Sequence, residues 1–445
     1  MNYKEARQYI TEKEGLGSVF GLDSIRELLR RLGNPEKGRP AIHIAGTNGK
    51  GSILAYVEET LVQAGLNVGR YISPTIYDYR ERWKHSKEWA SEAEVAETIT
   101  EVVSVVDEMI SDGLPSPTAF EIETAVTFLL FKKWNVDVML IECGMGGLLD
   151  ATNVIEADVI NVLASISRDH MQILGNTLTE ITTQKLGIVR DGSVLISYPQ
   201  VDEVRDVIDK YCTEHDVKLI NVDSSEIEVL ESDYGGSHFT YKGEEYSTAL
   251  GGVSQIYNAT VAIEVIREFF KGYIRNSENG ITVNTNEDVT DDVTGLIKMG
   301  LSKTEWDGRF SVVMRNPLVI VDGAHNEDAW LRLRDSLDKY FTNQKFVFII
   351  GVLRDKEYHK MIDILGPVAD YVYAIQSDSP RALTADELRD DFAEAGVETR
   401  SCGLDLEQAA EKALERAKKN GETVVVCGTL TISGEMIKCI KSMQS

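Results

Sequence analysis

Short apolar runs alternate along the chain with longer segments whose apolar positions recur at helical spacing. In the first example an apolar strand at Ala41–Ala45 leads through a glycine-rich loop into a helix, and a second strand follows at Val68–Ile72. The same pattern predicts helices at Ser91–Met109, Glu121–Trp134 and Asn258–Phe270, and strands at Asp137–Ile141 and Asp158–Ser165. Thr177 and Glu180 have the spacing of a capping box at the start of another helix.

Beyond residue 308 the alternation restarts and predicts a second α/β region. Its strands are expected at 317–321, 346–351, 371–375 and 423–427, and its helices at 384–395 and 405–419. Residues 219–250 alternate like a small antiparallel sheet, and Asn276–Asp292 is polar and acidic enough to indicate an inserted surface loop. We therefore predict an α/β protein with two domains, 1–300 and 301–445. Parallel sheets of this kind bind ligands beyond the carboxyl ends of their strands.

Composition narrows the range of partners. The chain has 445 residues, of which 43% are hydrophobic and 27% charged, as in an ordinary globular enzyme. Lysine and arginine number 46 against 72 acidic residues, so the formal net charge is −26. A surface this acidic repels phosphate backbones and anionic membranes, and we expect neither a nucleic acid nor a membrane as partner. The five cysteines are scattered, without a C-x-x-C pair, and no apolar h-region opens the chain, which favours the cytoplasm.

The segment Gly46–Ser52 is the strongest chemical signal in the sequence. It lies between a strand and a helix, where glycines let backbone N–H groups surround a phosphate and the helix N-terminus adds partial positive charge. Lys50 can then reach the β- and γ-phosphates. The common expression G-x-x-x-x-G-K-[ST] is not met, because Ile44 occupies the first glycine position and Gly51 follows the lysine. The alternative is a plain glycine-rich turn between strand and helix.

Other polar residues follow predicted strands at the same sheet edge. Glu142 closes an apolar strand, where a carboxylate above a phosphate site is placed to hold a hard cation, and the less favoured alternative is a solvated loop residue. Asp169 and His170 end the next strand, and a lone histidine is more often structural than functional. Lys185 would ordinarily be a solvated lysine. In the second region Asp322–Asn326 ends a strand with an acid, a histidine and an amide, which could be simple turn chemistry.

Taken together, these segments resemble the folylpolyglutamate synthase/dihydrofolate synthase family of the Mur ligase superfamily. The matching segments, in chain order, are Gly21-Leu22, Leu32–Pro35, His43–Ser52 (HIAGTNGKGS), Ser73-Pro74, Glu81-Arg82, Phe120-Glu121, Glu142–Asn153 (ECGMGGLLDATN), Asp169-His170, Leu174–Thr177, Lys185–Ile188, Gln255, Asn258-Ala259, Gly308-Arg309 and Asp322–Asn326 (DGAHN). Single motifs are weak, but this many in the order of the family are specific. The resemblance implies a P-loop-containing, parallel-sheet ATPase domain followed by a smaller Rossmann-like glutamate ligase domain.

The resemblance also implies an activity. Members of the family use ATP and Mg²⁺ to convert a substrate carboxylate to an acyl phosphate, from which the amine of L-glutamate displaces phosphate. The acceptor is a reduced folate or dihydropteroate. The sequence leaves open whether the enzyme acts on both acceptors or only extends folates. A related ligase acting on another carboxylate, a P-loop kinase or GTPase, and a nucleotide-binding regulator are the alternatives. We expect a monomer.

Site residues carried over from the family fall into four groups. The nucleotide-binding group is Thr47, Asn48, Gly49, Lys50, Gly51, Ser52, Asn258, Arg309 and Asp322. The acceptor-binding group is Gly21, Leu22, Phe120, Glu121, Leu149, Asp150 and Ala151. Two magnesium ions are expected on Ser73, Glu142, His170 and a carbamylated Lys185. The catalytic group is Lys50, Lys185, Arg309 and His325.

Some positions depart from the usual family residues. These are Thr75, Leu148, Gln184, Leu186 and Asp307. Most of them lie beside the expected metal and folate positions rather than on them, so the ATP chemistry is retained while the choice of pterin substrate stays open.

Overall fold

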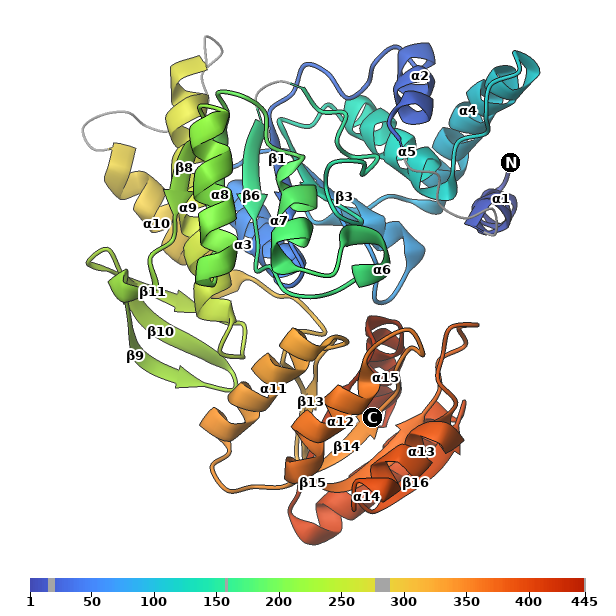
Figure 1. Ribbon diagram of the computed structural model, residues 1–445, viewed down its shortest axis with the longest axis vertical. Coiled ribbons are helices and arrows are strands. Elements are labelled where there is room, and N and C mark those ends of the chain that lie inside the picture. Colours follow the sequence, from blue (N-terminus) through green and yellow to red (C-terminus); the bar gives the residue numbers. More distant parts are fainter. Residues whose placement is uncertain (15–20, 157–158, 277–288, 444–445) are drawn as a thin grey trace. The chain divides into compact units, whose positions relative to one another are not determined.

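The computed structural model describes residues 1–14, 21–156, 159–276 and 289–443, and its chain forms two compact units (Figure 1). Unit 1 comprises Met1–Pro74, Asp78–Ser224 and Tyr257–Leu301, and unit 2 comprises Thr75–Tyr77, Ser225–Ile256 and Ser302–Ser445. The main change of unit thus follows Leu301, close to the predicted boundary at 300/301. The segment Ser225–Ile256, however, groups with unit 2, although the single predicted boundary assigns it to the first domain.

Unit 1 is built on an eight-stranded sheet in the order β4-β3-β2-β5-β1-β6-β7-β8. Its strands are β1 (Ala41–Ala45), β2 (Val68–Tyr71), β3 (Trp83–His85), β4 (Glu88–Trp89), β5 (Val138–Glu142), β6 (Val159–Leu163), β7 (Val194–Ser197) and β8 (Lys218–Asn221). The six strands from β2 to β8 in this order are parallel, and β3 and β4 extend one edge as an antiparallel hairpin. The carboxyl ends of the parallel strands therefore share one edge.

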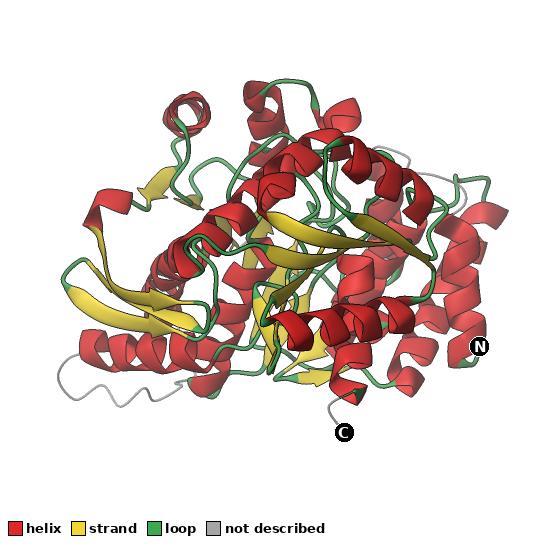
Figure 2. Ribbon diagram, turned by 90° about the horizontal axis from the view of Figure 1, so that it is seen from below, coloured by secondary structure: helices red, strands yellow, loops and turns green. Residues whose placement is uncertain are grey.

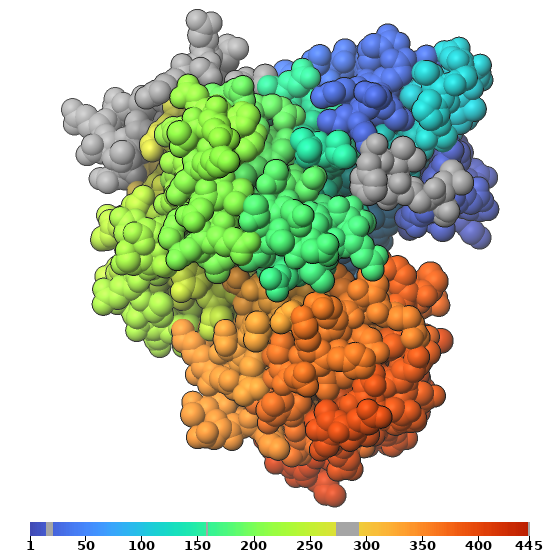
Figure 3. Space-filling view, in the orientation of Figure 1, coloured from blue at the N-terminus to red at the C-terminus, as the bar shows by residue number. Residues whose placement is uncertain are grey.

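Helices cover both faces of this sheet, which explains why β1 and β5 are buried along their whole length. The helices of unit 1 are α1 (Tyr3–Glu14), α2 (Asp23–Arg31), α3 (Lys50–Gln63), η1 (Tyr79–Arg82), α4 (Glu92–Ser111), α5 (Ala119–Lys133), α6 (Met171–Leu174), α7 (Leu178–Leu186), α8 (Asp202–Glu214), α9 (Gln255–Asn276) and α10 (Val289–Lys303), of which α9 and α10 reach a few residues into unit 2. Helices α7 and α8, coloured green, form much of the face of unit 1 seen in Figure 3. One apolar cluster joins α1, α2, α4 and α5 to the sheet, and another lies beneath α7 and α8.

Unit 2 contains a six-stranded sheet in the order β12-β13-β17-β14-β15-β16, with only β12 antiparallel, and a separate antiparallel sheet β11-β10-β9. Its strands are β9 (Ile227–Asp233), β10 (Gly236–Tyr241), β11 (Glu244–Thr248), β12 (Ser311–Arg315), β13 (Leu318–Val321), β14 (Phe346–Ile350), β15 (Ala369–Ile375), β16 (Thr399–Gly403) and β17 (Thr423–Cys427). Its helices are η2 (Ser224–Glu226), α11 (Glu327–Tyr340), α12 (Tyr358–Leu365), η3 (Gly366–Val368), α13 (Ala385–Glu394), α14 (Leu406–Asn420) and α15 (Leu430–Ser442). Figure 2 shows strands with helices on either side, and apolar clusters fill both faces of the larger sheet.

The expected elements are present, with bounds shifted by a few residues. The capping box of Thr177 and Glu180 opens α7, and the antiparallel patch at 219–250 contains β9 to β11. The predicted polar loop Asn276–Asp292 is wrong at its end, because α10 already begins at Val289. Val293, Ile297 and Leu301 recur at intervals of four residues and are buried, which fixes this helix. Residues 277–288 of the predicted loop lie outside the described residues.

Candidate active site

The phosphate-loop candidate leaves the centre of the unit 1 sheet. Strand β1 pairs with β5 on one side and β6 on the other, and the loop after it enters α3 at Lys50. Gly49 has φ +93°, and a Cβ there would lie 2.6 Å from Asn258 Oδ1. A Cβ at Gly46 would lie 2.6 Å from the Ala164 Cβ. Only glycine fits at both places, so the backbone itself forms the surface of a shallow cradle.

The loop is fixed to the residues that follow β6. The Thr47 amide donates to the carbonyl of Ser165 (2.7 Å), and the Thr47 hydroxyl donates to the carbonyl of Ser167 (3.0 Å). The Ser167 amide donates in turn to Thr47 Oγ1. These contacts hold the loop in one conformation before any ligand arrives, which lowers the entropic cost of binding.

Lys50 lies at the entry of α3 with its ammonium folded over the loop. Its Nζ donates to the carbonyls of Gly46 (3.2 Å) and Thr47 (3.3 Å) and lies 3.6 Å from Glu142 Oε1. Glu142 is the last residue of β5 and is 93% buried. A cation and a carboxylate thus meet beside the N-terminus of α3, the arrangement that holds a phosphate and its divalent cation.

Lys185, on α7, points to the same place from the opposite side. Its side chain is buried, and Nζ donates to the Gly46 carbonyl at 2.8 Å. Burial, and secondly the nearby Lys50 charge, lowers the pKa of Lys185 to about 7. A large fraction of Lys185 is therefore a neutral amine at neutral pH. Lys50, Glu142 and Lys185 are thus brought together around Gly46.

Ser73 and His170, the other predicted metal ligands, follow β2 and β6 at the carboxyl edge of the same sheet. Ser73 is partly buried, and the His170 side chain is 43% exposed, with Nε2 3.9 Å from Asp169 Oδ2. Within the described ranges, no group of three His, Cys, Asp or Glu side chains is close enough to hold a metal by itself. A magnesium ion at this edge would therefore take phosphate and water oxygens in addition to protein ligands.

The predicted acceptor residues differ in what their side chains do. The Phe120 ring covers Gly144, where an added Cβ would lie 2.5 Å from the ring. Glu121 closes a capping box with Thr118 at the start of α5, and Asp150 accepts from the Met145 and Thr152 amides. Burial raises the pKa of both carboxyls. Four predicted acceptor residues remain. Leu22 is the N-cap of α2, Leu149 is 45% exposed, and Ala151 is buried. Gly21, which precedes the cap, has φ +146°.

In unit 2 the residues Asp322–Asn326 connect β13 to α11. Asp322 accepts from the Phe310 and Ala324 amides, both at 2.8 Å, and burial raises its pKa while the Arg309 guanidinium opposes that shift. His325 Nδ1 donates to the Gly323 carbonyl at 2.8 Å. The Arg309 guanidinium lies against Gly323, where a Cβ would be 2.5 Å from Nη1. The three predicted residues of unit 2 therefore form one group at the carboxyl end of β13.

Sequence reasoning missed two features that shape the site of unit 1. Ala164 and Ser165 hold the phosphate loop through backbone contacts, which leave no signal in residue type. His43 lies inside β1, with Nε2 2.8 Å from Thr152 Oγ1 and 3.1 Å from Cys143 Sγ. A histidine in an otherwise apolar strand is a signal that could have been used.

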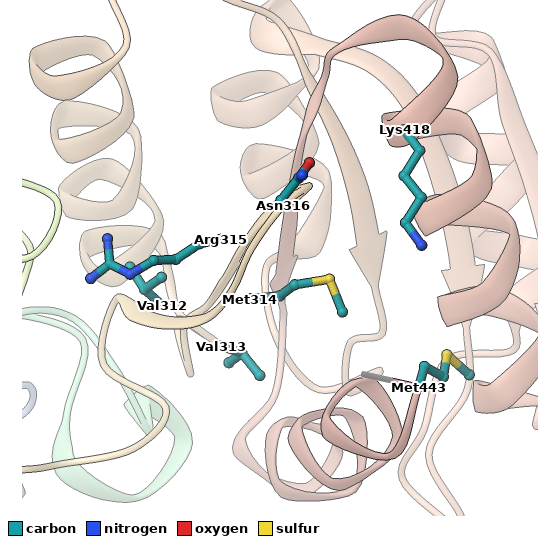
Figure 4. A pocket seen from close by; sticks show the side chains of 7 residues that line it. All are labelled: Val312, Val313, Met314, Arg315, Asn316, Lys418 and Met443. Carbon is teal, nitrogen blue, oxygen red and sulfur yellow. The ribbon is translucent and has the colours of Figure 1, made fainter. Parts of the chain in front are cut away.

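A hollow of about 570 Å³ opens elsewhere in unit 2 (Figure 4). It is lined by Val312, Val313, Met314, Arg315, Asn316, Lys418 and Met443. The turn between β12 and β13 lies here, at the amino end of β13. The hollow therefore opens at the edge of the sheet opposite to Asp322 and is separate from the predicted site residues of this unit.

Two family models match successive parts of the chain. Residues 44–266 match the family described as Mur ligase middle domain, and residues 308–430 match the family described as Mur ligase, glutamate ligase domain. The chain is 32% identical to the dihydrofolate synthase/folylpolyglutamate synthase of Bacillus subtilis, with 99% of both chains covered. It is 30% identical to the folylpolyglutamate synthase of Lacticaseibacillus casei, with 97% of both covered.

Solved structures resemble the whole chain as well. The Mycobacterium tuberculosis folylpolyglutamate synthase complexed with ADP superposes with a TM-score of 0.84 at 28% identity, covering 98% of each chain. The Escherichia coli FolC in complex with DHPP and ADP gives 0.78 at 28% identity, covering 99% of this chain and 98% of that one. No helix of the described residues is long and apolar enough to span a bilayer.

Proposed function

Because the chain belongs to the folylpolyglutamate synthase/dihydrofolate synthase family of Mur ligases, it is an ATP-dependent, ADP-forming ligase that adds glutamate to folate, and we propose that it also glutamylates dihydropteroate. The Bacillus relative carries both activities in its name and covers almost the full chain. The observation in this molecule that carries the proposal is the convergence of Lys50, Glu142 and Lys185 on Gly46 beside the N-terminus of α3.

The residues present fit a nucleotide. The glycine cradle, closed to any side chain at Gly46 and Gly49, lies beside a helix N-terminus and a lysine, which together suit a polyphosphate. We assign the phosphates to Thr47–Ser52 and a further nucleotide contact to Asn258. Arg309 and Asp322 are the nucleotide-binding residues proposed for unit 2, and His325 is the catalytic residue proposed there.

The same edge also fits magnesium, because its donors are carboxylate, hydroxyl and imidazole groups that suit a cation completed by phosphate oxygens. Glu142 and Ser73 would hold one ion, and His170 with a carbamylated Lys185 a second. When bound, the ions neutralise the charge on the transferring phosphoryl group. Support for the carbamate comes from the Lys185 pKa of about 7, since the neutral amine is the form that adds to carbon dioxide.

The proposed reaction has two steps. An oxygen of the acceptor carboxylate attacks the γ-phosphorus of ATP, the bond to the β–γ bridging oxygen breaks, and ADP leaves. The amine of L-glutamate then attacks the acyl carbon, phosphate leaves, and the amine loses a proton. Lys50 stabilises the transferring charge, and the acceptor is held by Gly21, Leu22, Phe120, Glu121, Leu149, Asp150 and Ala151. An acyl phosphate hydrolyses readily, so the site must exclude water during transfer.

Product mass is the direct test of this function. Purified protein is incubated with ATP, Mg²⁺ and glutamate, and with dihydropteroate or a reduced folate in turn. A mass increase of one glutamyl residue on both acceptors supports the proposal, and an increase on the folate alone limits the enzyme to chain extension. A phosphorylated acceptor as final product would indicate a kinase, and ATP hydrolysis without any acceptor would indicate a GTPase-like enzyme.

Positional isotope exchange tests the acyl phosphate. ATP labelled at the β–γ bridging oxygen is incubated with Mg²⁺ and acceptor but without glutamate. Scrambling of the label is expected, because reversible phosphoryl transfer lets the β-phosphate rotate before ATP re-forms. The acceptor used must be one that the enzyme glutamylates when glutamate is present. If the label of ATP is not scrambled with that acceptor, the acyl phosphate does not form before glutamate binds.

We also propose that the protein is a monomer in the cytoplasm and that its partners are small molecules. All five cysteines are free thiols, as a reducing compartment requires. Sedimentation of the purified protein at several concentrations tests the monomer.

A further inference from the structure

A buried hydrogen-bonded chain links the strand of the phosphate loop to the loop that follows Glu142. His43, on β1, contacts Thr152 Oγ1 through Nε2 at 2.8 Å. The Thr152 hydroxyl donates to Asp150 Oδ1 at 2.5 Å, and the Thr152 amide donates to the same oxygen at 3.0 Å. Asp150 Oδ2 accepts from the Met145 amide at 2.8 Å. Strand β1 and the loop that follows β5 are therefore tied together through three side chains.

With Asp150 ionised, one arrangement of protons satisfies the contacts of this chain, which Cys143 Sγ joins at 3.1 Å from His43 Nε2 and 3.6 Å from Thr152 Oγ1. An ionised Asp150 only accepts, so the single hydroxyl proton of Thr152 is donated to it. Thr152 Oγ1 must then accept, and the proton of the first contact is carried by His43 Nε2. Burial, and secondly the charge of Arg190, lowers the pKa of His43 to about 3, so the imidazole stays neutral across the working range of an enzyme. In this arrangement His43 donates to Thr152, and Thr152 donates to Asp150.

The loop that this chain holds touches both halves of the proposed site. At one end Gly144 lies under the Phe120 ring. Further along, the Leu148 amide donates to the carbonyl of Gln184, next to Lys185, and the side chain of Asn153 donates to the Leu148 carbonyl. Asp150, one of the residues proposed to hold the acceptor, lies in this loop, whereas the phosphate cradle has its own attachment to Ser165 and Ser167.

We propose that His43 and Thr152 are positioning residues for the acceptor: by fixing Asp150 and the Gly144–Thr152 loop, they set the acceptor site without touching a substrate. This inference rests on the proposed function for its catalytic readout. It differs from a purely structural role, because the binding of acceptor should depend on it and the binding of ATP should not.

The test uses two variants of Thr152 in the full chain. Thr152→Val keeps the side-chain shape but removes the hydroxyl, leaving His43 Nε2 with the weak acceptor Cys143 Sγ at 3.1 Å in place of an oxygen, whereas Thr152→Ser keeps the hydroxyl. We expect Thr152→Val to raise the KM for the acceptor by about tenfold or more, with the KM for ATP within about twofold of wild type. Thr152→Ser should restore the acceptor KM to within about threefold of wild type. His43→Leu should reproduce the valine phenotype from the other end of the chain.

Thr127→Val is the matched control. Thr127 is a buried threonine on α5 whose hydroxyl accepts from Trp83 Nε1 at 2.8 Å, outside the chain described above. It should lower thermal stability as Thr152→Val does while leaving the acceptor KM unchanged. Equal rises in the two KM values for Thr152→Val, or a rise in acceptor KM for Thr127→Val as large as for Thr152→Val, would overturn the inference.

A second measurement does not need turnover. Amide hydrogen exchange at Met145 and Thr152 should be faster in Thr152→Val than in wild type, and near the wild-type rate in Thr152→Ser, because Asp150 then keeps its orientation. Unchanged exchange in Thr152→Val would overturn the positioning chain even if the enzyme is active. If the wild-type protein has no glutamylation activity, the proposed function is contradicted. The exchange rates would still show whether Thr152 holds Asp150 in place.

Discussion

In unit 1 the connection from β1 to α3 and in unit 2 the connection from β13 to α11 both place polar residues after a buried strand, but they use those residues differently. After β1 the Thr47 side chain ties the turn to Ser167, while Gly46 and Gly49 leave the backbone uncovered, and the adjoining cation, Lys50, hydrogen-bonds to carbonyls of its own loop. After β13 the side chains build the turn themselves. Asp322 binds two amides, and Asn326 caps α11 by accepting from the Ala329 amide.

The difference separates two uses of similar sequence signals. In the first connection glycines leave the backbone uncovered, so a ligand can occupy the space that side chains would otherwise fill. In the second, Asp322 and Asn326 satisfy backbone donors that would otherwise be buried without partners, so removing them should first affect folding. A change in the β1–α3 connection should therefore lower activity with the fold retained, whereas a change at Asp322 or Asn326 should lower stability whatever its effect on activity.

Lys50→Ala gives the largest expected effect. We expect kcat/KM to fall by about a thousandfold or more, because a cation placed at the transferring phosphate contributes several kcal/mol in the transition state. The melting temperature should change little, since Nζ contacts only two loop carbonyls and lies 3.6 Å from Glu142. Steady-state kinetics and thermal unfolding measure the two quantities. Lys87→Ala removes a surface lysine paired with Glu59 and serves as the control for loss of charge. A folded Lys50→Ala protein with normal turnover would remove the basis of the phosphate-loop assignment.

Lys185→Ala should lower kcat by about a hundredfold, because the proposed carbamate would be lost with its metal contact. A short carboxylic acid added to this variant should restore part of the activity, and wild-type enzyme in carbon-dioxide-depleted buffer should regain activity when bicarbonate is added. Reactivation requires the neutral amine, so its rate should fall by up to about tenfold per pH unit below pH 7. Reactivation that is independent of pH between 5 and 7 would contradict the carbamate.

The same lysine gives a stability test with a defined sign. Lysine in an unfolded chain titrates near 10.5, whereas folded Lys185 titrates near 7, so between these values the unfolded state binds the extra proton. The free energy of unfolding should therefore rise with pH across this window in carbon-dioxide-free buffer, by at most about 1.4 kcal/mol per pH unit from this group. Urea unfolding at several pH values gives the free energy of unfolding of wild type and of Lys185→Met. The contribution of Lys185 is the difference between the two slopes of this free energy against pH. Equal slopes would mean that Lys185 is not desolvated.

Sequence patterns were sufficient for the sheet cores because the strands there are buried on both faces and read as continuous apolar runs. Thus β1 and β17 lie at the predicted residues. The patterns were not sufficient where pairing between distant segments decides structure. The hairpin of β3 and β4 has strands of three and two residues, too short for any periodicity, and α10 begins inside a segment whose acidic composition indicated a loop.

At the site, residue types and spacing identified Lys50 and Glu142, because a strand end predicts where a side chain lies. They could not identify Lys185, which became a candidate only through the family resemblance. Its importance comes from a contact with Gly46, 139 residues away, and from burial that a single sequence does not encode locally. For Asp150 and Glu121 the sequence predicted the location, but it did not predict that nearby backbone amides donate hydrogen bonds to their carboxylates.

Asp322→Asn tests the structural role of the connection in unit 2. An asparagine presents an NH₂ group to one of the two amides that now donate to the carboxylate, so we expect a loss of about 1–3 kcal/mol in the free energy of unfolding. Chemical denaturation with a probe in unit 2 measures it. Asp338→Asn is the control, because that carboxylate is 53% exposed and pairs only with Arg334 on the same helix. Stability equal to that of the control would show that Asp322 does not hold the turn.

Asn326→Ala gives the smallest effect and the sharpest comparison between the two connections. The Asn326 side chain caps α11 by accepting from the Ala329 amide at 2.9 Å, and losing such a cap costs about 1 kcal/mol. Asn326→Asp keeps the acceptor and adds a negative charge at the helix N-terminus, so it should equal or exceed wild-type stability. If the Asn326 side chain acts through this cap, Asn326→Ala should lose kcat only in proportion to its loss of folded protein. Asn326→Asp should then keep the wild-type kcat. Thermal unfolding and kinetics of both variants measure this. If Asn326→Asp instead lost activity at full stability, the amide itself would be a functional group, in addition to Asp322 and His325, the residues of this connection that are proposed to act on ligands.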